Sequence, residues 1–426
     1  LMTAGQLINW GMPTLAAEML NALDCQRTLP LYLQASLLPK AERGELVAKA
    51  IDVFPQFVRF PNTLEEVAAL ESIEECWFAR HLLACFYYNK RSYNKAIALW
   101  QRCVEMSPEF ADGWRGLAIH AWNKQHDYEL AARYLDNAYQ LAPQDARLLF
   151  ERDLLDKLSG ATPEKRLARL ENNQEIALKR DDMTAELLNL WHLTGQADKA
   201  ADILATRKFH PWEGGEGKVT SQFILNQLLR AWQHLDARQP QQASELLHAA
   251  LHYPENLSEG RLPGQTDNDI WFWQAICANA QGDETEAMRC LRLAATGDRT
   301  INIHSYYNDQ PVDYLFWQGM ALRLLGEQHT AQQLFSEMKQ WAQEMAKTSI
   351  EADFFAVSQP DLLSLYGDLQ QQHKEKCLMV AMLASAGLGE VAQYESARAE
   401  LTAINPAWPK AALFTTVMPF IFNYVH

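Results

Sequence analysis

The chain has 426 residues, of which 48% are hydrophobic and 21% charged, and its formal net charge at pH 7 is −15. This composition is typical of a folded protein and excludes an intrinsically disordered chain. The acidic balance argues against non-specific binding to nucleic acid or to anionic lipid, so we expect no nucleic-acid and no membrane partner. The length exceeds what one simple hydrophobic core supports and favours several domains or a repeat array.

Residues 1–76 are predicted to form the first part of such an array. Apolar residues recur there at helical spacing, as in Leu46, Ala50, Val53 and Phe54, but they match no repeat template. Degenerate helical pairs are therefore expected. No basic segment followed by a long apolar run opens the chain, and its seven cysteines form no CxxC motif. These features predict reduced thiols and a cytoplasmic location.

The segment from Trp77 to Pro108 follows the template of the tetratricopeptide repeat (TPR), a pair of antiparallel helices. The residues that carry the match are Leu83, Ala84, Tyr87, Ala96, Trp100, Cys103 and Pro108. Small residues let the helices approach closely, large residues fill the space between them, and the proline ends the second helix. A second unit starts near Trp114 and closes at Pro143, 35 residues after Pro108. Its one extra residue is expected in the turn at 125–127, and residues 77–206 are assigned to TPR-like repeats.

Residues 207–340 are assigned to TPR-like repeats with long inter-repeat loops. A Gly–x4–Ala–x3–large pattern marks the turn within each helix pair at Gly195, Gly282 and Gly326, where glycine supplies a left-handed C-cap. Three connections, 207–219, 253–269 and 297–313, are much longer than a TPR turn. Long loops in a compact array are usually functional or flexible. Because all three follow a second helix, we expect them close together on one edge.

Residues 341–426 are assigned to a degenerate C-terminal repeat and a capping helix. The apolar stretch at 411–425 is shorter than the ~20 residues that a spanning helix needs, so it predicts a terminal packing helix. Helix formers dominate the chain and runs of β-branched residues are absent. The predicted fold is therefore all-α: a TPR-like α-solenoid of antiparallel helix pairs forming a right-handed superhelix.

The first helices of TPR pairs line the concave face, and template positions on them define a candidate partner-binding surface. These positions hold His81, Tyr88, Asn89, Arg115, Trp122, Asn123, Phe272, Asn279, Phe316 and Arg323. No combination of lysines and asparagines that would form a two-carboxylate clamp can be read from this set. It predicts contact with a protein but does not support a receptor for peptide C-termini.

The long loops hold a second candidate site, for domain docking or for a ligand. Its residues are His210, Trp212, Glu213, Glu216, Lys218, Glu259, Arg261, His304, Tyr306, Tyr307 and Asp309. Aromatic rings in loops can stack on sugars, whereas most tryptophans here occupy helix positions used for core packing. No HExxH motif occurs, and 213–218 departs from a phosphate-binding loop at Trp212 and Val219. We therefore predict no metal, no cofactor and no catalytic residue. Asp267 or Asp269 is expected to cap the helix that follows.

Three loop phrases, HPWEGGEGKV, YPENLSEGRLPG and YNDQPVDYLFWQGMALRLLGE, carry a more specific similarity. Together they resemble the C-terminal region of large bacterial proteins of the YphG type, over at least residues 77–340. That family pairs an N-terminal galactose-mutarotase-like β-supersandwich with C-terminal TPRs. The resemblance implies that this chain is the C-terminal part of a larger bacterial, carbohydrate-associated protein. It also implies that the long loops dock against the β-rich domain.

The leading interpretation is a non-catalytic scaffold for intramolecular domain docking or protein–protein interaction. Its partner would be the N-terminal β-rich domain of the same gene product or another protein. The alternative is a loop-borne site in a carbohydrate-binding or carbohydrate-active enzyme, formed by Trp212, Glu213, Glu216, His304 and Tyr306. A third interpretation is a regulatory TPR receptor for a bacterial peptide.

Overall fold

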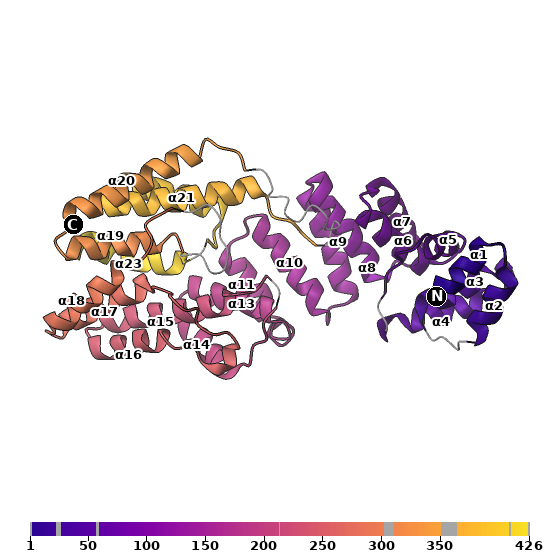
Figure 1. Cartoon of the computed structure of the whole chain (residues 1–426), viewed down its shortest axis with the longest axis horizontal. Coiled ribbons are helices and arrows are strands. Elements are labelled where there is room, and N and C mark those ends of the chain that lie inside the picture. Colours follow the sequence, from indigo (N-terminus) through magenta and orange to yellow (C-terminus); the bar gives the residue numbers. More distant parts are fainter. Residues whose placement is uncertain are drawn as a thin grey trace. The chain divides into compact units, whose positions relative to one another are not determined.

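The computed structural model describes residues 2–22, 27–56, 59–212, 214–301, 311–350, 364–408 and 410–424. All regular elements in these ranges are helices, most of them in antiparallel pairs joined by short turns (Figure 1). The predicted all-α, TPR-like fold class is confirmed. The chain divides into two compact units: unit 1 contains 1–155 and 353–366, and unit 2 contains 156–352 and 367–426.

Unit 1 is a succession of helices, many of which pack on the next along the chain. They are α1 (Met2–Asn9), α2 (Pro13–Ala22), α3 (Thr28–Ser36), η1 (Lys40–Glu42), α4 (Gly44–Asp52), η2 (Phe54–Gln56), α5 (Leu64–Glu71), α6 (Trp77–Asn89), α7 (Tyr93–Met106), α8 (Ala111–His120), η3 (Ala121–Gln125), α9 (Tyr128–Leu141) and α10 (Ala146–Leu158). Helix α6, for example, packs on α7, and α7 packs on α8. The last helix of the succession, α10, begins in unit 1 and ends in unit 2.

The predicted repeat from Trp77 to Pro108 is the pair α6 and α7. Ala84, Ala96, Trp100 and Cys103 are all fully buried, as the TPR template requires. The indole of Trp100 packs against Gly116 on α8, where a Cβ atom would lie 2.4 Å from the ring. A glycine at this position therefore lets the next repeat approach the aromatic side chain, because any larger residue would have to push it away.

The extra residue of the second repeat lies within a helical turn. The last turn of the first helix, η3, is a π-helix, in which one residue more than in an α-turn is enclosed. It closes with a hydrogen bond from the Asp127 N–H to the Ala121 carbonyl, and His126 is left-handed with φ 55°. The predicted position at 125–127 is thus only the end of the distortion. The π-turn itself carries Trp122 and Asn123, which belong to the predicted concave face.

Unit 2 continues the helix pairs. Its helices are α11 (Pro163–Glu171), α12 (Gln174–Ala177), α13 (Asp181–Leu193), α14 (Ala197–Thr206), α15 (Lys218–Asp236), α16 (Pro240–Ala250), η4 (Glu255–Leu257), α17 (Asn268–Ala280), α18 (Glu284–Ala294), α19 (Tyr314–Leu324), α20 (Gln328–Met345), α21 (Leu369–Leu388), α22 (Val391–Ile404) and α23 (Ala411–Tyr424). Gly195, Gly282 and Gly326 have φ values of 74°, 80° and 86°, so they form the predicted left-handed turns.

Helix α23 fills the inner side of unit 2, the side lined by the first helices of the pairs. It packs against α13 and α15, and its Phe414 and Phe420 contact Trp317 of α19 and Trp273 of α17. Figure 1 shows it beside α19 and next to α15 and α17. Leu413, Phe414, Val417 and Ile421 are fully buried. The predicted terminal packing helix is therefore an internal occupant of this surface.

A partly buried carboxylate on α13 connects the neighbouring helices of unit 2. Glu186 accepts from Lys157 at the end of α10 (2.6 Å) and from Arg166 of α11 (2.9 Å), and Arg166 is fully buried. Burial raises the pKa of Glu186, but the charges and hydrogen bonds of Lys157 and Arg166 outweigh it and lower the pKa to about 2. Glu186 therefore stabilises the fold as long as it stays ionised.

Substituting Glu186→Gln is expected to lower the free energy of unfolding of unit 2 by about 2 kcal/mol at pH 7. The folded pKa lies below the ordinary value, so the stabilisation is present above pH 4.5 and is lost as the pH falls towards about 2. Urea unfolding should therefore show a difference between wild type and variant that shrinks over this range. A difference independent of pH would contradict the ion-pair explanation. Glu337→Gln, at an exposed position of α20, is the control.

Candidate functional site

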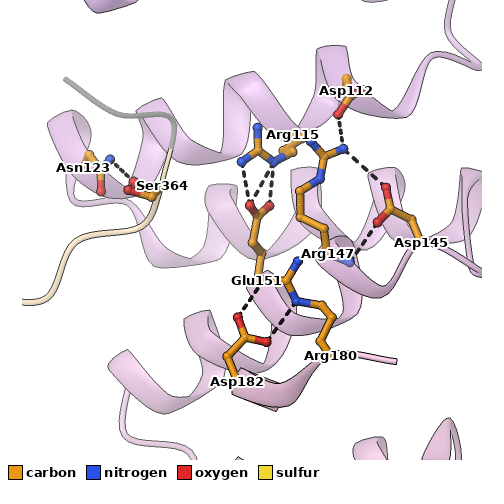
Figure 2. Close-up of polar contacts among 9 residues, drawn as sticks. All are labelled: Asp112, Arg115, Asn123, Asp145, Arg147, Glu151, Arg180, Asp182 and Ser364. Atoms are coloured by element: carbon orange, nitrogen blue, oxygen red, sulfur yellow. Dashed lines mark hydrogen bonds and ion pairs between the residues drawn. The ribbon is translucent and has the colours of Figure 1, made fainter. Parts of the chain in front are cut away.

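The inner face of unit 1 holds a short segment from a distant part of the chain, residues 364–366. The Asn123 side chain donates from Nδ2 to the Ser364 carbonyl at 2.7 Å and accepts at Oδ1 from the Tyr366 N–H at 3.0 Å. Trp122 donates from Nε1 to the Tyr366 carbonyl at 2.7 Å. Figure 2 shows Asn123 facing Ser364. Three hydrogen bonds thus hold the main chain of this segment.

These hydrogen bonds recognise the main chain of the segment and not the identity of its side chains. In an extended chain the carbonyl of one residue and the N–H of the second residue after it point to the same side, so one carboxamide can bind both. Leu365, between them, is only 7% exposed and supplies an apolar anchor. Beneath Asn123 lies Tyr88, whose hydroxyl is 3.4 Å from Nδ2 and whose pKa is raised by burial to about 12. The surface therefore offers main-chain hydrogen bonds together with a buried apolar contact.

The π-turn explains why Trp122 and Asn123 act together. They are adjacent in the sequence, and both side chains reach the same three-residue segment. In a regular α-helix, neighbouring residues point about 100° apart, whereas the widened turn changes their direction. Asn89, at the corresponding place in the preceding repeat, is the last residue of the regular helix α6 and is partly buried. The specific feature of this site is therefore the one-residue insertion.

Two other predicted residues of this face serve packing. Arg115 of α8 binds Glu151 of α10 through two nitrogens, with distances of 2.6, 2.7 and 3.0 Å (Figure 2). Both side chains are nearly buried. His81 stacks on Phe78, and burial lowers its pKa to about 4, so it is neutral at pH 7. Neither side chain is free to meet a partner in this structure.

The predicted contact residues of unit 2 require a correction. Phe272 and Phe316 are fully buried, and Phe316 packs on Phe414 of α23, so they are core residues and not an accessible concave surface. Asn279 donates to the Tyr424 hydroxyl at 2.9 Å, and Arg323 donates to the Gly387 carbonyl at 2.6 Å. The physical reason is the apolar α23, which covers this side of the unit.

The long loops of unit 2 come together, with the first two directly hydrogen-bonded. Asn256 accepts at its carbonyl from Phe209 N and donates from Nδ2 to the carbonyls of Leu204 and Arg207. Ser258 donates to the Phe209 carbonyl at 2.6 Å. A partly buried amide side chain thus satisfies the backbone of the neighbouring loop, which an irregular segment needs when it packs against protein.

These loops surround a pocket of about 860 Å³ at the start of α15. Of the predicted loop residues, Trp212, Glu216 and Glu259 line it. Tyr253, Tyr314 and Lys410 also line it, and no sequence pattern singled them out. Glu259 accepts from the Gly217 N–H at 2.8 Å, next to the first residue of α15. The structure therefore joins residues from four separate stretches of sequence around one cavity.

Lys410, which lines this pocket, belongs to a cluster of buried ion pairs. Lys410, just before α23, lies 2.5 Å from Asp313 and 3.1 Å from Asp269, and both carboxylates are buried. Burial raises the pKa of Asp313, an effect that Lys410 opposes. Arg261 pairs with Asp267 and approaches the Tyr253 ring. Of the two expected caps of α17, Asp267 precedes the helix, but its carboxylate binds Arg261 and Gln265. Asp269 lies inside the first turn of the helix and accepts from the Ile270 N–H at 2.9 Å.

The other predicted loop residues have separate environments. His210 is exposed and bonds Asp181 through its backbone N–H at 2.9 Å, and Lys218 is exposed at the first position of α15. The remaining predicted residues lie outside the described residues: Glu213, His304, Tyr306, Tyr307 and Asp309.

Across the described ranges, no group of three or more His, Cys, Asp or Glu side chains is arranged to hold a metal ion. Six cysteines in the same ranges are free and buried, and burial raises the pKa of several of these thiols, Cys103 among them. The helices that the structure describes include none with the length and hydropathy to cross a membrane.

No protein-family model matches the chain. Among solved structures, it is similar to Naa15/Naa10 bound to HypK-THB at 14% identity and a TM-score of 0.37, covering 90% of this chain and 52% of that one. The chain thus spans about half the length of that protein. The TPR domain of P58(IPK) matches at 13% identity and a TM-score of 0.24, over 89% and 96% of the two chains. The Cut9–Hcn1 hetero-tetramer matches at 11% and 0.24, over 98% and 84%.

Proposed function

We propose that this protein is a non-catalytic TPR scaffold whose unit 1 binds an extended segment of a partner protein on its inner face. The observation that carries the proposal is the set of three hydrogen bonds that join Trp122 and Asn123 to the main chain of residues 364–366. The internal segment supports this choice of ligand, because the face binds the Ser364 carbonyl and the Tyr366 N–H and carbonyl on either side of the buried Leu365. A partner segment of that kind would replace it.

Main-chain recognition suits a scaffold because it tolerates many sequences. Backbone hydrogen bonds give affinity in such complexes, and the pocket for an alternate side chain gives specificity. Here the buried Leu365 supplies the apolar contact and Asn123 supplies the paired hydrogen bonds. A tethered segment competes at an effective concentration in the mM range, so the intact chain should bind only partners that outcompete it.

The probe for this proposal is a fluorescent peptide of residues 359–368, QPDLLSLYGD. Leu365→Asp in the full chain should release the internal segment, because a carboxylate would have to be buried. We expect this variant to bind the peptide at least tenfold more tightly than wild type, as measured by fluorescence anisotropy. Adding Asn123→Ala should abolish the gain, whereas adding Asn89→Ala should leave it unchanged.

Two results would overturn the proposal. One is equal peptide binding by the Leu365→Asp chain with and without Asn123→Ala. The other is failure of the Leu365→Asp chain to bind the peptide although circular dichroism shows a folded protein. Hydrogen exchange over η3 gives a second measurement, since release of the internal segment should expose the Tyr88–Asn123 contact to solvent.

For the identity of the partner, we propose the β-rich N-terminal domain of the same gene product, in a bacterial protein associated with carbohydrate. The support is the resemblance of the three loop phrases to YphG-type proteins. A test is cross-linking of the β-rich region, supplied in trans, to this chain. Cross-links to the loops at 207–219 and 253–269 or to η3 are expected, and absence of any association would remove the proposal.

A further inference from the structure

We infer that the pocket at the start of α15 binds a small organic cation with an apolar body. This site is distinct from the inner face of unit 1, and the inference does not depend on the proposed scaffold function. It rests on the shape of the pocket, its aromatic walls and the balance of its charges. The volume of about 860 Å³ falls within the range of cavities that hold drug-sized ligands.

Aromatic side chains form the walls. Trp212, Tyr253 and Tyr314 line the pocket together with Ile224 and Leu262. Leu262 is 40% exposed and adds accessible apolar surface to the wall. Arg261 and Lys410 already approach the Tyr253 and Tyr314 rings. A cationic ligand therefore relies on the Trp212 indole, whose negative face attracts positive charge, while all three rings attract an apolar body through dispersion.

The indole of Trp212 packs against the backbone of its own loop. It lies directly against Gly215, where a Cβ atom would be only 2.0 Å from the ring. The Gly215 N–H donates to the Trp212 carbonyl at 3.0 Å, which closes the turn. A side chain packed in this way loses less conformational entropy on binding than a free one. Position 215 therefore requires glycine, because a residue with a Cβ atom would collide with the indole ring of Trp212.

The charges of the pocket favour a cation over an anion or a neutral ligand. Among the described residues that line the pocket are two carboxylates, those of Glu216 and Glu259, and one cation, Lys410. Behind the lining, Asp269 and Asp313 pair with Lys410, and Asp267 pairs with Arg261. Both cations already pair with buried aspartates, so they are not available to an incoming anion. Glu216, which is exposed, and Glu259 remain to face a ligand. Their two negative charges favour a ligand that carries a positive charge.

Choline and its uncharged carbon isostere, dimethylbutanol, form a matched pair of probes because they differ mainly in charge. Calorimetry on the full chain should show choline binding at least tenfold more tightly than dimethylbutanol. Trp212→Ala should weaken choline binding at least tenfold, and Glu216→Gln combined with Glu259→Gln should remove the preference for the cation. In Glu259→Gln the side-chain amide oxygen can still accept from the Gly217 N–H, so the start of α15 is retained.

Two controls separate the site from general effects. Glu255→Gln lies on η4, close in sequence but outside the lining, and Trp10→Ala removes an exposed indole of unit 1. Neither should change choline binding. Equal binding of choline and dimethylbutanol would overturn the inference, as would methyl glucoside binding more tightly than either. Absence of any choline binding at millimolar concentration would overturn it as well.

Discussion

Replacing Glu151 by alanine is expected to lower the free energy of unfolding of unit 1 by about 3 kcal/mol or more. Arg115 and Glu151 are 11% and 9% exposed, and three close contacts join them. The guanidinium is always ionised at neutral pH, so it cannot escape by losing its proton. Without the carboxylate, the positive charge remains in a site largely closed to water. The measurement is urea unfolding of the full chain, with hydrogen exchange to place the loss in α8 and α10.

A double variant distinguishes the charge from the packing. Arg115→Met with Glu151→Leu removes both charges and keeps apolar volume, so it should recover most of the lost stability. If the double variant is as unstable as Glu151→Ala, shape and not charge governs this site. Glu105→Ala removes an exposed partner of Arg102 on α7 and should change stability by only about 0.5 kcal/mol.

The repeat architecture could be predicted because its signals are local. Spacings such as that from Pro108 to Pro143, and glycines such as Gly195, depend on the turns that join two helices and leave their mark in the sequence. The extra residue between the two prolines was also visible. Its location in a π-turn was not, because a wider turn and a longer loop have the same sequence length. That distinction matters, since the turn positions Trp122 and Asn123.

Contacts between distant segments could not be predicted. The template places Phe316 towards the inner side of the solenoid, but no single sequence shows that Phe414, almost a hundred residues later, packs on it. Residues 364–366 likewise contain no motif that predicts their contact with Asn123. In both units, positions predicted to face a partner face another part of the same chain. Whether the chain covers its own inner face depends on which distant segments meet in three dimensions. The periodicity of the sequence does not contain this information.

In the candidate pocket, too, local features could be predicted and contacts between distant segments could not. Loop lengths indicated that residues such as Trp212 and Glu259 would meet, because loops after second helices share an edge. Lys410 gave no such signal, since it lies in a different connection, before the last helix. The capping rule failed at Asp267 for a related reason: it assumes that the carboxylate is free to bond the first turn of the helix. Arg261 competes for it.

Substituting Lys410→Met is expected to lower the free energy of unfolding of unit 2 by about 3–5 kcal/mol at pH 7. Asp269 and Asp313 have side chains only 0% and 9% exposed, and both bond the Lys410 ammonium group. Burial lowers the pKa of Lys410, but the two carboxylates outweigh burial and raise it above the ordinary value. Lysine is therefore charged at pH 7, and methionine would leave two negative charges together in the interior. Protection from hydrogen exchange in α17, α19 and α23 should fall together.

The pH dependence identifies the cause. Burial already raises the pKa of Asp313 in the wild-type chain despite the lysine, so without Lys410 it should rise further. A carboxyl group whose folded pKa is raised holds its proton more tightly in the folded state, so stability increases as the pH falls. The loss of stability in Lys410→Met should thus be largest at pH 7 and shrink towards pH 4.

Adding Asp269→Asn and Asp313→Asn should restore stability at pH 7. Lys374→Met, which loses an exposed pair with Glu400, should change stability by less than about 1 kcal/mol at either pH. A deficit that stays constant from pH 7 to pH 4 would show that the methionine disturbs packing rather than charge.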